Sequence, residues 1–568
     1  MPRTINSACG ALTLAALSAC GGPQGDAAGG ADAAAPEASA DPRSDRPDAG
    51  EDSADARVET GEDAATGPDR PSTGNGFDAE LWRRSTIYFL MTDRFWDGDP
   101  TNNGRADCFD PASPSLFHGG DLAGIRARLD YLEELGVDAV WITPVSAQVP
   151  RHGDWCGYHG YWADLADPDE GAIEPHLGTD TELTGLIDDL HGRGMKLITD
   201  LVVNHSGRGA RIVDMHPGWF HPQDGCGNLG PGEIFCPLAG LPDFAQERRE
   251  VADYLDAMSA GWMRRFAFDG IRMDTAKHVP AEYFADRFIP TVLRERPGLY
   301  LVGEIFDEGS YALQVRYRAA GFHGFFDFPL RRALIDGFAR GGSLRPIADR
   351  VREAAQAFGP EGALLRSTFL DNHDVGRFTR EIPRDLPPEV REARYLLALS
   401  LLFTAPGIPQ IYAGDELGAE DADNRRDMPA WAFDPPSRRV PHEGFLPGAE
   451  RIFNATRALI ALRREIPALH RGGYAELWHP SPTDNVYAFH RSDGSSQAIV
   501  AFNGGDAPVA SLRIGLVRNN QITARDKDAI ARGPSSARLQ TAGATLTVDR
   551  GELLLSLPPR TVEVWSVP

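Results

Sequence analysis

GVDAVWITPV (136–145), TELTGLIDDLHGRG (181–194) and KLITDLVVNH (196–205) follow one another along the chain and decide its fold class. The first and third stretches are short apolar runs, typical of buried strands, and the second carries apolar residues at helical spacing. A strand, a helix and a second strand in this order predict parallel strand pairing with the helix packed on the sheet.

The same alternation continues through most of the chain. Further strand-like runs are TIYFLMTDRF (86–95), GIRMD (270–274), LYLVGEIF (299–306), FFDFPL (325–330), LRSTFLDNHD (365–374) and IPQIYAGDE (408–416). Eight such runs separated by amphipathic stretches predict an α/β fold, a (β/α)8 TIM barrel rather than an open sheet. Several runs end in polar or charged residues, and in such a barrel those ends form the catalytic face.

Two segments interrupt this pattern. Residues 206–246 are too long and too rich in Gly and Pro for a simple loop, so we expect a small subdomain inserted after the third strand. After the helical stretch 449–469 the pattern changes to short alternating runs such as VYAFHRS (486–492) and TVEVWSV (561–567). We therefore predict a catalytic barrel over 77–469 and a C-terminal antiparallel β-sandwich over 470–568.

The N-terminus has the pattern of an export signal over residues 1–19. Arg3 precedes the apolar run ALTLAAL (11–17), and LSAC (17–20) is similar to a bacterial lipobox, which implies lipidation of Cys20. Gly21 at the next position implies an outer-membrane lipoprotein; an ordinary cleaved signal is the alternative. Residues 20–76 are rich in Ala, Asp, Glu, Gly and Pro, so we expect a disordered acidic tether.

Composition limits the partners. The 568-residue chain has a formal net charge of −25, which disfavours nucleic acid as a partner. No long apolar run follows the first twenty residues, so we expect no membrane-spanning segment. A neutral substrate suits such a surface, and we expect a monomer.

The candidate chemistry lies at the strand ends. In GIRMD, alternation places Arg272 and Asp274 on one side of the strand, and the arginine would keep the aspartate ionised. Glu304 follows an apolar run, where partial desolvation would raise its pKa. Asp374 ends a third run. One ionised and one protonated carboxyl group are what hydrolysis of a glycosidic bond requires.

The order DLVVNH, LPDFA, GIRMDTAKH, GEIF and FLDNHD resembles the sequence regions of the α-amylase family, glycoside hydrolase family 13. GVDAVWITPV and GIPQIYAGDE are similar to two further regions, and the resemblance runs from about residue 80 to the end of the chain. It implies Asp274 as nucleophile, Glu304 as acid/base and Asp374 as transition-state stabiliser. It also implies retention of configuration, for which the Asp274 and Glu304 carboxyl groups lie about 5–5.5 Å apart.

The resemblance further implies a set of substrate-binding residues. Tyr161 would stack on the sugar at the cleavage point, and Asp200 would orient Arg272. The complete set that we expect to contact an α-glucan is Tyr161, His205, Arg272, Lys277, His278, Phe306 and His373. The pair Lys277–His278 favours α-1,4-glucans such as starch, glycogen or maltooligosaccharides.

Calcium is the expected cofactor, at one or two structural sites. The first would use Asn204, Asp243 and the backbone carbonyl of His278, matching a family site that pins the inserted subdomain to the barrel. The second, in DGDPTNN (97–103) and HGGD (118–121), would use these groups: Asp97, Asp99, Asn102, Asn103, the Gly119 carbonyl and Asp121. Carboxylate and amide oxygens suit calcium; a plain polar turn is the alternative for the second site.

Four cysteines remain after the signal region, an even number in a chain expected to be exported. They allow three pairings. The short separation of Cys226 and Cys236 favours that local disulfide, which leaves Cys108–Cys156.

Three other functions compete with hydrolysis. Cyclodextrin-forming glucanotransferases place an aromatic residue where this chain has Ala239, and they carry additional β domains, so both features favour hydrolysis here. Phe306 resembles an acceptor-site aromatic and keeps transfer open. Cyclomaltodextrinases usually carry an extra N-terminal β domain, which the tether cannot supply. A non-catalytic, glucan-binding surface lipoprotein is the alternative from another class.

Overall fold

The computed structural model describes residues 76–104, 107–165, 171–481, 483–516, 519–533 and 536–567. The predicted signal peptide, the lipidation site at Cys20 and the tether lie outside the described residues. Within the described ranges, no helix combines the length and the apolar character needed to cross a membrane.

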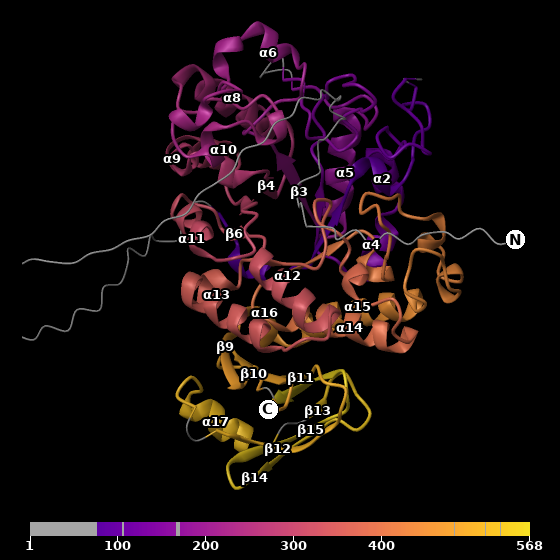
Figure 1. Ribbon diagram of the computed structural model, residues 1–568, viewed down its shortest axis with the longest axis vertical. Coiled ribbons are helices and arrows are strands. Elements are labelled where there is room, and N and C mark those ends of the chain that lie inside the picture. Colours follow the sequence, from indigo (N-terminus) through magenta and orange to yellow (C-terminus); the bar gives the residue numbers. More distant parts are fainter. Residues whose placement is uncertain are drawn as a thin grey trace, which may run out of the picture. The chain divides into compact units, whose positions relative to one another are not determined.

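Eight parallel strands form the barrel (Figure 1), as the sequence predicts. They are β1 (Ile87–Leu90), β2 (Ala139–Ile142), β3 (Lys196–Leu201), β4 (Gly270–Met273), β5 (Tyr300–Gly303), β6 (Gly324–Phe325), β7 (Ser367–Thr368) and β8 (Ile408–Tyr412). The order β6-β5-β4-β3-β2-β1-β8-β7 leaves one seam, between β6 and β7. A single parallel bridge between Phe326 and Ser367 closes it.

The strands β6 and β7 are much shorter than the runs FFDFPL and LRSTFLDNHD suggest. Asp327 caps α12 (Phe328–Leu334) by accepting a hydrogen bond from the Leu330 N–H, and Pro329 lies in the first helical turn. A cap and a proline there end the strand and start the helix. Arg366 forms a buried ion pair with Asp327 across the seam.

Helices surround the sheet (Figure 1). The main ones are α3 (Leu122–Ala127), α4 (Leu129–Leu135), α5 (Asp180–Gly192), α8 (Arg249–Arg265), α10 (Ile289–Glu295), α11 (Ala312–Ala319), α13 (Arg345–Ala363), α14 (Pro388–Thr404), α15 (Ala449–Glu465) and α16 (Pro467–Arg471); short ones are α1 (Ala79–Arg84), α2 (Thr92–Phe95) and α9 (Ala281–Tyr283). The stretch 449–469, predicted as one helix, is two helices, because Pro467 cannot continue α15 and disfavours helical geometry at Ile466.

The segment after β3 contains only short helices, α6 (Arg211–Met215) and α7 (Gly232–Phe235), with single turns between them. A disulfide joins Cys226 and Cys236 within this segment. A second disulfide joins Cys108 and Cys156, whose Cα atoms lie 6.0 Å apart. The structure therefore contains the pairing that the sequence favours.

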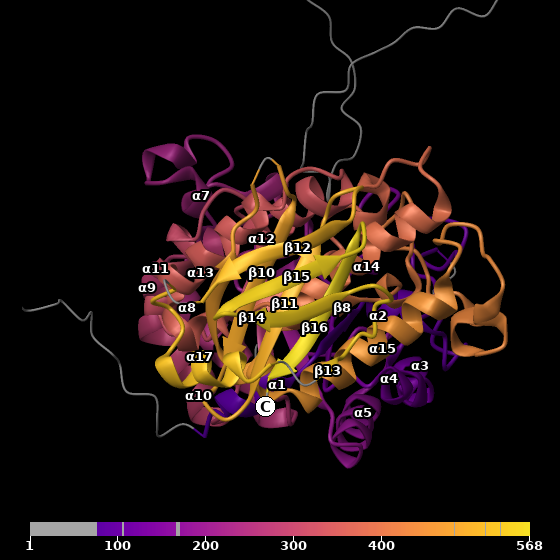
Figure 2. The same ribbon diagram turned by 90° about the horizontal axis from the view of Figure 1, so that it is seen from below.

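The C-terminal region is an antiparallel β domain of two sheets (Figure 2). One sheet contains β9 (Gly473–Trp478), β10 (Val486–Ser492), β11 (Gln497–Asn503), β13 (Ser536–Ala537) and β16 (Thr561–Val567), and the other β12 (Val509–Gly515), β14 (Thr545–Asp549) and β15 (Glu552–Leu557). Their inner faces share one apolar core. A helix not predicted from the sequence, α17 (Ala524–Ala531), joins this core through Ile530 and begins at the capping residue Thr523.

Two buried arginines, one from this domain and one from the barrel, meet at the C-terminus of α14. Arg491 of β10 donates to the carbonyl oxygen of Thr404 at 2.7 Å, and Arg463 of α15 donates to that of Phe403 at 3.2 Å. Both carbonyls lie at the C-terminus of α14, where cations are favoured by unpaired carbonyl groups and the helix dipole. The contact therefore holds the β domain against a barrel helix.

Candidate active site

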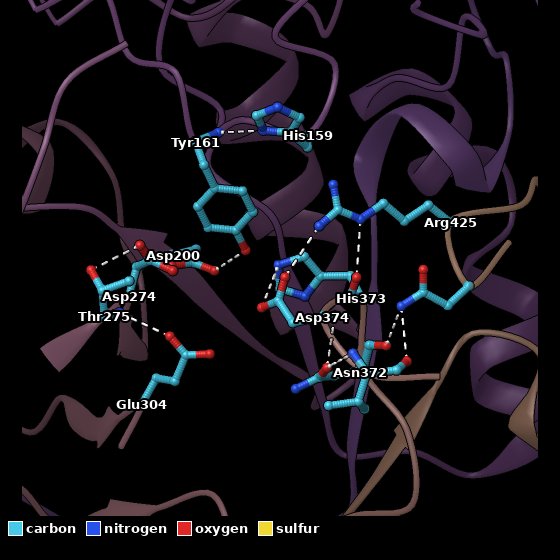
Figure 3. Close-up of polar contacts among 12 residues, drawn as sticks. His159, Tyr161, Asp200, Asp274, Thr275, Glu304, Asn372, His373, Asp374 and Arg425 are labelled. Atoms are coloured by element: carbon cyan, nitrogen blue, oxygen red, sulfur yellow. Dashed lines mark hydrogen bonds and ion pairs between the residues drawn. The ribbon is translucent and has the colours of Figure 1, made fainter. Parts of the chain in front are cut away.

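Three carboxylates meet at the carboxyl ends of the barrel strands (Figure 3). Asp274 directly follows β4 and Glu304 directly follows β5, and Asp374 lies in the loop after β7. Asp274 and Glu304 are 5% and 7% exposed, so both lie almost entirely within the protein. The barrel thus brings together residues that are separated by a hundred positions in the chain.

Arg272 is the shared cation of this site. Its Nη1 lies 2.6 Å from Oδ1 of Asp274, and its Nη2 lies 2.9 Å from Oε1 of Glu304. Burial alone would lower the pKa of Arg272, but the surrounding carboxylates hold it well above the usual value. One rigid guanidinium therefore fixes both carboxyl groups beside each other.

Asp200, at the end of β3, orients that guanidinium. Both of its oxygens accept hydrogen bonds from Arg272 Nη1, at 3.1 and 3.0 Å. Its Oδ2 also accepts from the Tyr161 hydroxyl at 2.8 Å and from the indole N–H of Trp141 at 3.2 Å. With both terminal nitrogens held by carboxylates, Arg272 has little freedom to leave its position.

Glu304 has the properties of a proton donor. Burial raises its pKa from the ordinary value of 4.5 to about 7; Arg272 opposes this shift, and the charges of Asp274 and Asp374 add to it. The backbone N–H of Thr275 donates to Oε2 at 2.9 Å. A carboxyl group with this pKa is protonated in part at neutral pH, as general acid catalysis requires.

Asp374 lies in a different environment. Its Oδ2 is 3.3 Å from Nε2 of His373 and its Oδ1 accepts from Arg425 Nη2 at 3.1 Å. Burial would raise the pKa of Asp374, but His373, Arg425 and Arg272 outweigh it and lower the pKa below the usual value. Asp374 is therefore held as a carboxylate, unlike Glu304.

Rings suited to sugar contact surround the carboxylates. The rings of Tyr161 and His373 are stacked with centroids 5.0 Å apart. Burial lowers the pKa of His205, and that of His373 to about 3, so both rings are neutral. Within the described residues, His205 Nε2 and His373 Nδ1 are buried without a hydrogen-bond partner. A sugar hydroxyl at the site would satisfy them.

Lys277 and His278 connect the site to the inserted subdomain. Lys277 Nζ donates to the carbonyl oxygen of Phe306 at 3.1 Å, and His278 Nδ1 lies 2.7 Å from the carbonyl oxygen of Glu233 in α7. The Phe306 ring packs on Phe328, with centroids 4.4 Å apart. Lys277 is therefore joined to Phe306, and His278 is joined to the inserted subdomain.

The sequence did not point to Arg425, Thr275 or Glu233. Arg425 lies in the long loop after β8, and such loops line the catalytic face of a barrel. The sequence feature that could have indicated Arg425 is its position in this loop, among the acidic residues of EDADNRRD (420–427). Thr275, directly after Asp274, has a positive φ of 47°, a conformation that a threonine in the sequence does not indicate.

The first candidate calcium site has the geometry of a cation cradle. One end of the Asn204 amide lies 3.2 Å from Oδ1 of Asp243 and 2.9 Å from the His278 carbonyl oxygen. With the amide oxygen in that place, three oxygens face one another without a proton, which a cation would stabilise. The residues therefore fit calcium.

The second candidate site fits only in part. Asp97 Oδ1, Asn102 Oδ1 and Asn103 Oδ1 are buried without a partner among the described residues. A Cβ at Gly119 would lie 2.7 Å from Asn103 Oδ1, so the glycine permits a close backbone approach. Asp121, however, has both oxygens occupied: Oδ1 accepts from Gly98 and Gly124, and Oδ2 from Asp99 and Asn102. Oδ1 of Asp99 likewise accepts a hydrogen bond from the Thr101 hydroxyl, so this oxygen is occupied too.

Comparison with known proteins identifies the family. The α-amylase catalytic domain model matches residues 89–216 and 234–438, and the α-amylase C-terminal all-beta domain model matches residues 478–568. The chain belongs to the α-amylase family. It is a glycoside hydrolase, as its relatives and structural neighbours are.

Several relatives of this α-amylase-family chain have related activities. It is 30% identical to neopullulanase 2 of Thermoactinomyces vulgaris, with 77% of this chain and 72% of the relative covered. It is 27% identical to a cyclomaltodextrinase of Geobacillus thermopakistaniensis, covering 86% and 78%. It is 28% identical to the beta/alpha-amylase of Paenibacillus polymyxa, of which it spans only 38%.

Solved structures give the same result. An α-amylase from Geobacillus thermoleovorans in complex with acarbose is 30% identical at a TM-score of 0.70, covering 86% of this chain and 99% of that one. A cyclomaltodextrin glucanotransferase named CldA, described as having a three-domain ABC distribution, is 25% identical at a TM-score of 0.70, covering 85% and 99%. Additional β domains are thus not a requirement for a glucanotransferase, so the number of β domains does not argue for hydrolysis.

Proposed function

We propose that this protein hydrolyses α-1,4-glucosidic bonds in starch, glycogen or maltooligosaccharides with retention of configuration. The observation that carries the proposal is the Arg272 bridge, which holds an almost fully buried Asp274 and Glu304 on two nitrogens of one guanidinium. Carboxyl groups held side by side in this way suit a direct displacement by one of them, as in retaining enzymes.

The proposed reaction has two steps. Asp274 attacks the anomeric carbon while Glu304 gives its proton to the leaving oxygen, and a glycosyl-enzyme forms. Glu304, now a carboxylate, takes a proton from water, which attacks the same carbon and releases Asp274. Asp374, held ionised by His373 and Arg425, would accept hydrogen bonds from sugar hydroxyls as positive charge develops on the ring.

The test is turnover and stereochemistry. Purified protein should release reducing sugar from amylose, and the first product seen by proton NMR should be the α-anomer. Asp274→Ala should abolish turnover; substantial residual activity would rule out the nucleophile assignment. A protein that binds amylose but releases no sugar would instead support the glucan-binding lipoprotein.

Cyclodextrin hydrolysis and glucan transfer form a second candidate. A cyclomaltodextrinase and a glucanotransferase are among the similar proteins, and Phe306, which resembles an acceptor-site aromatic, is held by Lys277 through its carbonyl oxygen. Ala239, at the position of the glucanotransferase aromatic, still favours water as the acceptor. Products from amylose, maltoheptaose and β-cyclodextrin, separated by chromatography, distinguish these activities: new chains longer than the substrate indicate transfer.

The calcium prediction becomes part of this proposal. Asn204, Asp243 and the His278 carbonyl would hold a structural Ca²⁺ that joins the inserted subdomain to the strand ends, supported by the converging oxygens at Asn204. The second site would use Asp97, Asn102 and Asn103, whose oxygens lack partners. The ion would neutralise converging oxygen dipoles and charges; it takes no part in the chemical steps.

We also propose export and lipidation at Cys20, which place a monomeric enzyme on a bacterial outer membrane. The support is the LSAC motif and the presence of two disulfides in the folded part. Metabolic labelling with a palmitate analogue tests it: Cys20→Ser should lose the label and leave the membrane fraction, whereas a labelled Cys20→Ser variant would refute it.

A further inference from the structure

Thr275, directly after Asp274, has an unusual backbone conformation. Its φ of 47° and ψ of 34° lie in the left-handed region, which β-branched residues rarely adopt. Such outliers persist only where the surroundings over-determine them, and they cluster at functional sites. The conformation therefore calls for a functional explanation.

This conformation lets one residue contact both central carboxylates (Figure 3). The Thr275 backbone N–H donates to Oε2 of Glu304 at 2.9 Å, and its side-chain hydroxyl donates to Oδ2 of Asp274 at 3.1 Å. An extended backbone after β4 would direct the N–H elsewhere. The left-handed turn thus places two donors at the point where the chain leaves the strand.

The two oxygens of Asp274 are held differently. Oδ1 forms an ion pair with Arg272 at 2.6 Å, whereas among the described residues Oδ2 accepts only the longer bond, 3.1 Å, from the neutral Thr275 hydroxyl. A hydroxyl rotates freely about its C–O bond, so Oδ2 can be released at little cost. Oδ2 is therefore the oxygen available for attack.

We propose that Thr275 is a positioning residue that aims Oδ2 of Asp274 and stabilises it as the departing carboxylate of the second step. The proposal rests on the function proposed above. In the first step a lone pair of Oδ2 forms the bond to the anomeric carbon, and the leaving oxygen keeps the electrons of the broken bond and takes the Glu304 proton.

In the second step a water oxygen bonds to the anomeric carbon and its proton passes to Glu304. The electron pair of the broken carbon–oxygen bond returns to Oδ2, where the Thr275 hydroxyl donates to the new negative charge. A donor aimed at developing charge lowers the barrier of the step in which the charge appears. The hydroxyl should therefore matter most for release of the glycosyl-enzyme.

Three variants separate the hydroxyl from the shape of the side chain. Thr275→Val keeps β-branching without the hydroxyl, Thr275→Ala removes both, and Thr275→Ser keeps the hydroxyl alone. The control Thr291→Val replaces a buried threonine in α10 on the outside of the barrel. The substrate is α-maltotriosyl fluoride, whose leaving group needs no proton, so breakdown of the glycosyl-enzyme limits kcat.

We expect Thr275→Val and Thr275→Ala to lower kcat about tenfold, the effect of one hydrogen bond to a charged group, and to lower kcat/KM less than threefold. Intact-protein mass spectrometry should show accumulated glycosyl-enzyme. Thr275→Ser should recover kcat to within about threefold of wild type. Circular dichroism and thermal unfolding establish that each variant folds.

Equal losses in Thr275→Ser and Thr275→Val would overturn the proposal, as would an unchanged kcat in Thr275→Val or equal falls in kcat and kcat/KM. Asp274→Ala, measured alongside, separates this outcome from failure of the proposed function. If Asp274→Ala is inactive and the Thr275 variants behave alike, only the role of Thr275 is lost. If Asp274→Ala stays active, the proposed function fails first.

Discussion

Replacing Glu304 with Gln should change how the stability of the protein depends on pH. Burial raises the pKa of Glu304 from 4.5 to about 7 in the folded state, whereas the unfolded chain keeps the ordinary value. A carboxyl group with a raised folded pKa contributes full stability below pH 4.5 and loses that contribution as pH rises through 7. Glu304 therefore destabilises the folded protein at alkaline pH.

The expected size follows from the two pKa values. Between pH 5 and pH 8 the wild-type protein should lose about 2.5 kcal/mol of unfolding free energy through Glu304 alone. Glu304→Gln cannot titrate and should not lose it. Because unfolding entropy is about 2.1 cal/mol/K per residue over some 480 residues, the difference in Tm between variant and wild type should grow by about 2–3 °C.

The assay is thermal unfolding at several pH values, without substrate. The quantity compared is the difference in Tm between variant and wild type at each pH. Effects that do not change with pH, such as the introduced amide facing the Thr275 N–H, then cancel. The matched control is Glu282→Gln, whose carboxyl group is 71% exposed. In parallel, kcat/KM of wild type should fall about tenfold per pH unit above pH 7 as the acid ionises.

A pH-independent difference between Glu304→Gln and wild type would refute the reasoning, because it would mean that Glu304 titrates normally. The fall in kcat/KM above pH 7 should also be absent from Glu304→Gln, measured with a substrate whose leaving group needs a proton. A variant that still shows this fall would refute the reasoning too.

Three other perturbations test separate parts of the structure. Replacing Cys108 and Cys156 with Ser should cost about 4 kcal/mol, because that disulfide closes a 48-residue separation; chemical denaturation under oxidising conditions measures it, and an unchanged midpoint contradicts it. Calcium chelation should lower the Tm of wild type more than that of Asn204→Ala, which lacks a ligand of the first site, as differential scanning calorimetry would show; equal shifts would exclude Asn204 as a ligand. Arg425→Gln should reduce kcat at least tenfold by removing a charged hydrogen bond to Asp374, and steady-state kinetics with unchanged kcat would exclude that role.

The barrel and the positions of its carboxylates could be predicted because both follow from local patterns. Apolar runs alternate with helical periodicity, and Asp274 and Glu304 directly follow such runs. The lengths of the strands at the seam were harder to predict, because Asp327 is the one polar residue of FFDFPL and its capping role appears only in the structure. Pro467, in contrast, marked the break between α15 and α16 in the sequence itself.

The rest of the site depends on tertiary structure. Arg425 reaches Asp374 from a loop without periodicity, so no local pattern indicates which residue it contacts. The left-handed turn at Thr275 contradicts the preference of a β-branched residue, and only the surrounding bonds impose it. Converging oxygens at Asn204 likewise arise from three separated parts of the chain.

The first described residues bear on how a long substrate could approach the active site. Phe77 stacks on His323 with centroids 3.8 Å apart and lies near Tyr300, the first residue of β5. It is thus at the amino ends of the strands, whereas Asp274 and Glu304 follow their carboxyl ends. A long glucan chain would therefore reach the carboxylates from the pole opposite Phe77, without passing the start of the described chain.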